Sequence, residues 1–340
     1  RTFLNPSNVG WRYSVLSFFG VVVAALLDID LCSLLLSAEE MIARCSPDVP
    51  LAENPSVSLG TDLAGFAMGG HDKLTILTSP KLTSFARWTE QLIAESTGKD
   101  GMGILPVVGE PILDSSAYGD DRVFVYLRLA EDDNSVLDKA MAHLQDVGHP
   151  VINIDLQNQE DLAGEFYRWE LATAIAGSIL GLNPFDQPNV ELAKRATDQI
   201  LSEHNNDELI ELSSIGSVDN LLNVVEPNQY FAIMAYVQPD LRFEQFVADL
   251  RRRVMQRHKV ATTFGYGPRY LHSTGQLHKG GPPTGLFLQV VMSHHDEIEI
   301  PDSSYTFGKL VNAQAEGDFR ALKSMGRQIV RVRLEELIAQ

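Results

Sequence analysis

A glutamate near the end of an amphipathic segment has the setting of a general base. Glu95 belongs to the run Gln91–Lys99, whose apolar spacing predicts the last turns of a helix before a glycine turn. The partial negative charge at a helix C-terminus disfavours ionisation of a carboxylate there, which suits proton transfer near neutral pH. The letters STGK that follow do not form a phosphate loop, because Ile93 stands where its first glycine belongs. A solvated glutamate at a helix end is the alternative.

Two cations are placed where each could bind an anionic oxygen. In Val9–Ser14, a glycine beside Arg12 lets the backbone approach a ligand while the guanidinium binds an oxyanion. In Asn183–Lys194, Pro188 predicts the first turn of a helix and Lys194 falls in its second turn. The helix dipole gives a lysine no advantage there. Each residue therefore either contacts a substrate or is an ordinary structural or surface cation.

Histidines gather in a glycine-rich segment towards the end of the chain. Phe264–Gly281 contains His272 and His278, and ordering so many glycines costs backbone entropy, which favours a functional loop. The two histidines lack the helical i,i+4 spacing of a zinc pair. The run His294–Asp296 follows a predicted strand in polar company, which is more typical of a solvated edge than of a metal site. The residues therefore predict no metal.

An alternation of strands and helices must position these groups. Apolar runs predict strands at residues 74–78, 123–129, 151–156, 231–237, 285–292 and 328–334. Helical spacing predicts helices between them, at residues 85–97, 136–147, 162–180, 188–204 and 243–254. This order is typical of an α/β protein with a three-layer parallel sheet flanked by helices. A polar segment after residue 204 predicts two domains, 1–204 and a smaller α/β region at 205–340.

Composition limits the classes of partner. The 340 residues carry a formal net charge of -18, which argues against general nucleic-acid or anionic-membrane binding. A small anionic substrate then needs a few local cations. The apolar stretch 15–36 predicts a buried helix rather than a membrane span, because Asp28 and Asp30 interrupt it. The two cysteines lack metal-ligand spacing, which is typical of reduced thiols in a cytoplasmic protein. No signal peptide is visible, and a start at Arg1 favours a piece of a longer protein.

Taken together, four of these segments resemble the phosphoglucose isomerase family. Val9–Ser14 is similar to its signature V-G-G-R-[FY]-S, Glu95–Lys99 to its segment E-S-x-G-K, and Gly177–Lys194 to its second signature. Thr263–Gly281 is most like the isomerase half of bacterial transaldolase/phosphoglucose isomerase fusions. The family pairs two sugar-isomerase (SIS) domains. The resemblance implies that this chain holds the second, flavodoxin-like SIS domain, with an upstream SIS domain and a transaldolase domain as partners in the parent chain. The family's Ser/Thr-rich phosphate loop has no convincing equivalent here.

The resemblance also implies an activity and a set of roles. The family interconverts glucose 6-phosphate and fructose 6-phosphate through a cis-enediolate, without a metal or organic cofactor. Glu95 would be the base, Arg12 would stabilise the enediolate, and Lys194 would open the ring or position the substrate. His272 would open the ring, with His149 as the alternative in the family's usual order. The expected substrate-binding residues are Gly10, Ser96, Thr97, Lys99 and Gln187.

Two departures from the family pattern keep a second function open. Trp11 replaces the second glycine of the first signature, where an indole could block the site or displace Arg12, and Asn189 replaces a glycine of the second signature. The competing interpretation is a non-catalytic SIS module that binds a sugar phosphate or docks on a partner domain. A nicotinamide dehydrogenase is disfavoured because no G-x-G-x-x-G follows a predicted strand. Family members are usually homodimers, so a homo-oligomer is a further expectation.

Overall fold

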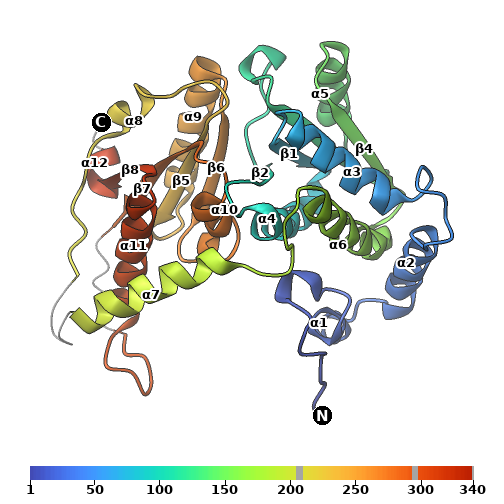
Figure 1. The fold of residues 1–340 in the computed structure, drawn as a ribbon, viewed down its shortest axis with the longest axis horizontal. Coiled ribbons are helices and arrows are strands. Elements are labelled where there is room, and N and C mark those ends of the chain that lie inside the picture. Colours follow the sequence, from blue (N-terminus) through green and yellow to red (C-terminus); the bar gives the residue numbers. More distant parts are fainter. Residues whose placement is uncertain (204–209, 293–297, 339–340) are drawn as a thin grey trace. The chain divides into compact units, whose positions relative to one another are not determined.

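The structure is a computed structural model that describes residues 1–203, 210–292 and 298–338 (Figure 1). The chain forms two compact units. The first unit comprises Arg1–Thr97, Met102–Val108 and Asp121–Asp186, and the second comprises Gly98–Gly101, Gly109–Asp120 and Gln187–Gln340. Among the described residues, no helix has the length and hydropathy to cross a membrane.

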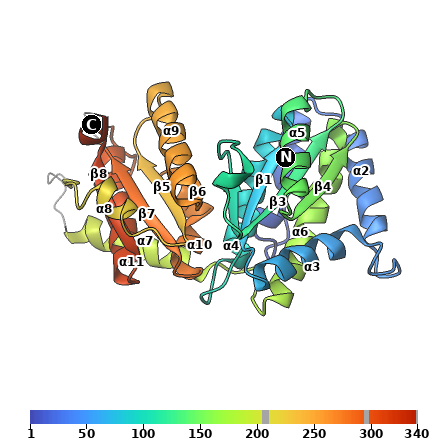
Figure 2. The same ribbon diagram turned by 90° about the horizontal axis from the view of Figure 1, so that it is seen from above.

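The first unit is built on a four-stranded parallel sheet with the order β2-β1-β3-β4. Figure 2 labels three of these strands, β1, β3 and β4, side by side. The strands are β1 (Lys73–Thr78), β2 (Leu105–Val108), β3 (Arg122–Leu129) and β4 (Val151–Leu156). Its core lies between this sheet and three helices, α3 (Pro55–Met68), α4 (Thr83–Thr97) and α6 (Leu162–Ile179). The helix α5 (Ser135–Asp146) packs beside β4.

Small residues let two of these helices approach closely. α3 begins at Pro55 after an Asn54 cap whose side chain accepts two backbone N–H bonds. A Cβ on Gly60 of α3 would lie 2.6 Å from the carbonyl oxygen of Ala172 in α6. Trp169 of α6 is fully buried and fills the core beneath this contact. The helix α4, which carries Glu95, packs into the same core as these two helices.

The N-terminal apolar stretch differs from its prediction. Instead of one buried helix at 15–36, the structure has α1 (Phe18–Leu26) and α2 (Leu31–Arg44), and α1 contains no buried residue. The two aspartates explain the break. Asp28 adopts a left-handed conformation, and Asp30 caps α2 by accepting bonds from the N–H groups of Cys32 and Ser33. The prediction of a buried helix was therefore wrong.

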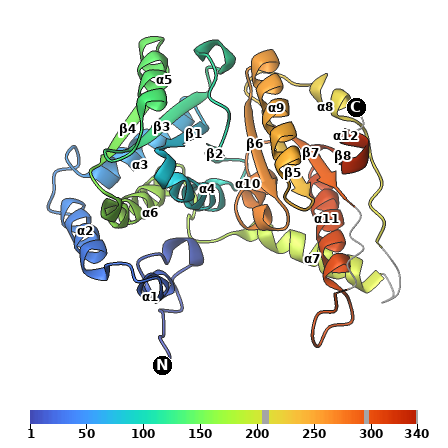
Figure 3. The same cartoon turned by 180° about the vertical axis from the view of Figure 1, so that it is seen from behind.

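The second unit has its own four-stranded parallel sheet, with the order β6-β5-β7-β8 (Figure 3). Its strands are β5 (Tyr230–Tyr236), β6 (Ala261–Tyr266), β7 (Gly285–Val291) and β8 (Gln328–Arg333). One face packs on α9 (Leu241–His258), with α8 (Val218–Leu222) and α12 (Leu334–Ile338) beside it. The other face carries α11 (Phe307–Ser324), which packs on α7 (Pro188–Glu203), and the short α10 (Gly275–Gly280).

The predicted α/β class is confirmed, because both sheets are parallel and flanked by helices. β2 and β6 were not predicted. The predicted helix at 188–204 exists as α7 and begins at Pro188. It packs against α11 and belongs to the second unit. The predicted boundary at 204/205 therefore lies after α7, whereas the compact units divide before it.

Candidate active site

A buried ion pair forms the centre of the candidate site in the first unit. Arg12 lies in a short 3-10 helix, Trp11–Tyr13, and is only 4% exposed. Its Nη1 is 3.3 Å from Oε2 of Glu95, which is 6% exposed in the last turn of α4. The guanidinium thus places a fixed positive charge beside the carboxylate that was predicted to act as a base. The two residues were predicted to act together, and the structure brings them into contact.

The remaining donors of Arg12 join three segments that are far apart in the sequence. Its Nε donates to Oγ of Ser96 at 2.9 Å. Its Nη2 donates to the carbonyl oxygens of Pro184 and Asp186 at 2.8 and 2.9 Å. The planar fork of arginine suits this set of divergent acceptors, and lysine could not satisfy them together. Arg12 therefore holds the first signature, the helix end and the second signature in one cluster.

A tyrosine and a second glutamate adjoin the cluster. The hydroxyl of Tyr13 lies 3.0 Å from Oγ of Ser96 and donates to the Pro184 carbonyl at 3.3 Å. Burial raises the pKa of Tyr13, so its hydroxyl stays protonated at neutral pH. Burial also raises the pKa of Glu170, on α6, to about 8. Neither Tyr13 nor Glu170 was predicted as a site residue. Tyr13 stands at a position of the first signature that phenylalanine also occupies, so its hydroxyl gave no signal, and a glutamate on a helix gives none either.

The other residues predicted near this cluster have distinct surroundings. A Cβ on Gly10 would meet no atom within 4 Å, so the backbone there is open to approach. The hydroxyl of Thr97 donates to the Ile93 carbonyl at 2.8 Å and accepts from the Ile104 N–H at 3.0 Å, which holds the turn after α4. Trp11 is 82% exposed and stacks on Phe19 with ring centroids 5.5 Å apart. The indole has therefore not displaced Arg12.

In the second unit, the charge of Lys194 acts on His272. Lys194 is exposed on α7, with Nζ 3.2 Å from Oε1 of Glu191. His272 ends the 3-10 helix Arg269–His272. Burial, and then the positive charge of Lys194, lower the pKa of His272 from its ordinary value. The imidazole is therefore neutral at pH 7 and can accept a proton.

A glutamine that was not predicted connects the remaining motifs within the second unit. Gln276, on α10, is fully buried. Its Nε2 donates to the carbonyl oxygen of Gly98 at 2.9 Å and to Oδ1 of Asn189 at 2.7 Å, while its Oε1 accepts from the Asn189 N–H at 2.9 Å. Gly98 lies three residues after Glu95 in the chain. The glycine-rich segment thus holds the backbone of Gly98, and Asn189 has a specific partner.

Four further residues singled out in the sequence differ in their burial and contacts. Lys99 is 2% exposed, whereas Gln187 is exposed just before α7. His278 is a core residue, because it is buried with Nδ1 2.9 Å from the Tyr230 hydroxyl. His149 packs edge-on against a phenylalanine ahead of β4. The run His294–Asp296 lies outside the described residues. Over residues 1–203, 210–292 and 298–338, no group of three or more metal-ligating side chains is close enough to hold a metal ion.

Comparisons with known proteins agree with the resemblance of the motifs. The chain is 30% identical over 232 residues to the glucose-6-phosphate isomerase of Heliobacterium modesticaldum, covering 57% of this chain and 52% of that protein. It is 31% identical over 233 residues to the glucose-6-phosphate isomerase of Staphylococcus haemolyticus, with the same two coverages. Glucose-6-phosphate isomerase is another name for phosphoglucose isomerase, so the predicted resemblance is confirmed.

The extent of these matches is limited. The chain spans about half the length of the curated relatives that it matches. No family model matches the chain. Among solved structures, the C-terminal domain of glucosamine-fructose-6-phosphate aminotransferase from Francisella tularensis aligns with 85% of this chain and 93% of its own. Its TM-score is 0.26 and its sequence identity 11%, so this likeness carries no argument.

Proposed function

We propose that this chain supplies catalytic residues of a glucose-6-phosphate isomerase. The observation that carries the proposal is the buried Arg12–Glu95 ion pair, held by bonds to Ser96 and to the Asn183–Asp186 loop. It combines a carboxylate that can transfer a proton with a fixed positive charge that can stabilise an enediolate, the two functions that an aldose–ketose isomerisation uses. The similarity to curated glucose-6-phosphate isomerases supports the same reaction.

Each residue has a defined role in the proposed reaction. Glu95 removes the proton from C2 of the open-chain aldose, which leaves a cis-enediolate with its negative charge on O1. The hydroxyl proton of O2 passes to O1, and Glu95 returns its proton to C1 to give the ketose. Arg12 stabilises the negative charge that develops on the enediolate oxygens. The neutral imidazole of His272 and the ammonium of Lys194 serve ring opening and substrate orientation. No metal or organic cofactor takes part in this sequence of proton transfers.

We further propose that the parent chain is longer and carries an upstream SIS domain, fused to a transaldolase domain. The support is that the curated relatives extend to about twice the matched length, together with the resemblance of Thr263–Gly281 to the fusion proteins. The mass of the native protein, measured in an extract of its source, tests this. A native mass equal to the 37.6 kDa of this chain would contradict it.

The substitution Glu95→Gln tests the function. It keeps the shape of the side chain and removes the base, so we expect kcat for fructose 6-phosphate conversion to fall by about 10²- to 10⁴-fold. Exchange of the C2 proton with deuterated solvent should fall equally. The matched control is Glu131→Gln, which changes an exposed glutamate outside the cluster. The assay is run on this chain and on a parent chain that includes the preceding domain. Unchanged exchange in Glu95→Gln would refute the base assignment, and binding without turnover in every form would favour a non-catalytic module.

A further inference from the structure

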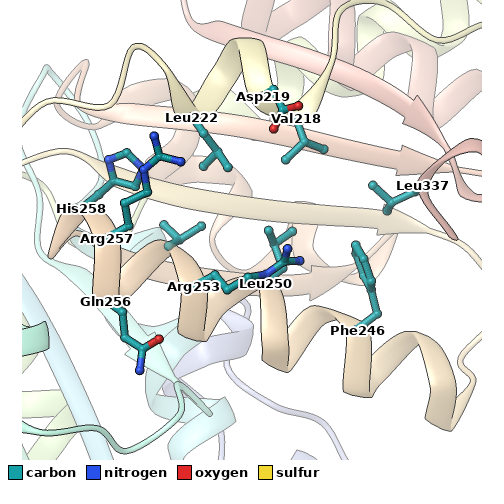
Figure 4. A pocket seen from close by; sticks show the side chains of 11 residues that line it. Val218, Asp219, Leu222, Phe246, Leu250, Arg253, Gln256, Arg257, His258 and Leu337 are labelled. Atoms are coloured by element: carbon teal, nitrogen blue, oxygen red, sulfur yellow. The ribbon is translucent and has the colours of Figure 1, made fainter. Parts of the chain in front are cut away.

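A cavity lies in the second unit, and none of its lining residues has a role in the proposed isomerisation. Its volume is about 600 Å³, within the range of sites for small organic ligands. Three elements line it: the short helix α8, one side of α9, and Leu337 of α12 (Figure 4). The cavity therefore lies on the face of the sheet that α9 covers.

The lining has an apolar end and a cationic end. Phe246 and Leu337 lie at one end of the view, and Arg257 and His258 lie together at the other (Figure 4). Arg253 lies on α9 between these two ends. The remaining apolar lining is contributed by Val218, Leu222, Leu250 and Val254. A ligand that fills this space thus needs an apolar body and a negative head group.

The cations of this cavity are left without acidic partners. Within the described part of the chain, Arg253 and Arg257 form no ion pair, whereas their neighbour Arg252 pairs with Asp249 at 2.5 Å. Asp219 is the one acidic side chain in the lining, and it lies across the cavity on α8. In a chain of net charge -18, these two guanidinium groups make the lining of this cavity locally positive.

A buried polar atom at the cationic end also lacks a partner. Nε2 of His258 is inaccessible to solvent and has no hydrogen-bond partner among the described residues. Burial, and then the charge of Arg257, lower the pKa of His258, so the ring is neutral at pH 7. Because Nε2 has no accessible surface, His258 forms part of the wall at this end of the cavity and adds no positive charge there at pH 7.

We propose that this cavity binds a small organic anion with an apolar body, such as an aromatic or branched aliphatic carboxylate, phosphate or sulfonate. The head group binds at the cationic end, where Arg257 lies, and Arg253 adds a second positive charge to the cavity. The body packs on Phe246 and on the leucines of α8 and α9. The site is independent of the proposed isomerase function, so it stands or falls separately.

The test uses 8-anilinonaphthalene-1-sulfonate, whose fluorescence reports transfer to an apolar site. We expect saturable binding to the whole chain. The double substitution Arg253→Gln, Arg257→Gln should raise Kd at least about tenfold. A hydrogen bond to a charged group contributes about 1.5–3 kcal/mol, and a loss of about 1.4 kcal/mol corresponds to a tenfold change in Kd. The control Arg252→Gln should leave Kd unchanged. A second variant, Leu222→Trp, fills the cavity without altering charge and should also abolish binding. The neutral analogue N-phenyl-1-naphthylamine should not respond to the arginine substitutions.

Three results would overturn the proposal. They are the absence of saturable binding of the sulfonate, equal affinity in the wild type and the double variant, or an equal loss in Arg252→Gln. Near-ultraviolet circular dichroism confirms that each variant keeps its fold. If the double variant is misfolded, Leu222→Trp decides alone, and retained affinity in that variant contradicts the site.

Discussion

At the scale of single residues, Arg12 holds the segments of the candidate active site together. Its guanidinium bonds to Glu95, to Ser96 and to two backbone carbonyls, all in a buried setting. Replacing it by lysine keeps the charge but leaves several of these acceptors without a donor. We expect Arg12→Lys to lower the free energy of unfolding by about 2–4 kcal/mol. The loss of transition-state stabilisation, obtained from the ratio of the kcat/KM values, should be at least as large.

Urea denaturation followed by circular dichroism measures the first effect, and the isomerase assay at a temperature where the variant is folded measures the second. The exposed ion pair of Arg252 with Asp249 is the matched control, and Arg252→Lys should change stability by less than about 1 kcal/mol. Equal stability of Arg12→Lys and the wild type would show that the bonds of Arg12 contribute little.

The same cluster shows how far residues can be predicted from sequence. Arg12 and Glu95 were identified through family motifs, because their spacing alone did not separate a site from a surface ion. Gln276 was missed because a glutamine in a glycine-rich run has no distinctive pattern. Its importance depends on the proximity of Gly98 and Asn189, which tertiary structure creates. Conversely, His278 has the look of a functional residue in the sequence but is a core histidine bonded to a tyrosine.

At the scale of elements, α6 makes stability depend on pH. It carries Glu165 and Glu170, and burial raises their pKa values from the ordinary 4.5 to about 7 and about 8. Between pH 4.5 and these values the folded state binds more protons than the unfolded state, so the free energy of unfolding falls as pH rises. We expect the two groups together to lower the free energy of unfolding by about 6 kcal/mol between pH 5 and 8, with the larger share from Glu170.

The substitution Glu170→Gln should flatten this profile, because the amide does not ionise, and should stabilise the protein most at pH 8. Urea unfolding at several pH values checks this, with exposed Glu131→Gln as the control whose profile should follow the wild type. A Glu170→Gln profile that still falls as steeply as the wild type would contradict the assignment.

Gly280 lies in α10 where neighbouring segments of the second unit approach the helix closely. A Cβ on Gly280 would lie 2.4 Å from Oδ1 of Asn189 and 2.7 Å from the Gly98 carbonyl oxygen. We therefore expect Gly280→Ala to lower the free energy of unfolding by about 1–3 kcal/mol. Gly65→Ala, in α3, is the matched control, since its Cβ meets no atom within 4 Å and alanine favours a helix by about 1 kcal/mol. Urea unfolding compares the two, and equal effects would exclude the steric explanation.

Elements differ in how well the sequence predicts them. β3, β5 and β7 are buried along nearly their whole length, as expected of strands covered on both faces of a parallel sheet, and all were predicted. β1 and β4 were predicted as well, although β4 has two exposed polar positions. β2 is only four residues long and contains Pro106, and β6 mixes threonine and glycine with its aromatics, so neither gave a clear run. The apolar letters of α1 predict burial, but the structure leaves this helix exposed. Apolar content indicates that a surface can be covered, and only tertiary structure decides what covers it.

At the scale of the whole molecule, charge and length predict how this chain should behave alone. Its net charge of -18 repels a sugar phosphate at long range, so the phosphate needs local donors. The sequence shows no equivalent of the family's phosphate loop, and the chain spans about half the length of its curated relatives. We expect this chain to have a KM for fructose 6-phosphate at least about tenfold above that of a longer parent chain, since the loss of one charge-assisted contact is worth about 1.5–3 kcal/mol.

A coupled assay of both forms, repeated in raised salt, separates the effect of net charge from that of missing phosphate donors. Salt that restores KM in this chain would assign the loss to net charge, whereas a KM insensitive to salt would assign it to missing phosphate donors. Equal KM in both forms would show that this chain holds the phosphate by itself.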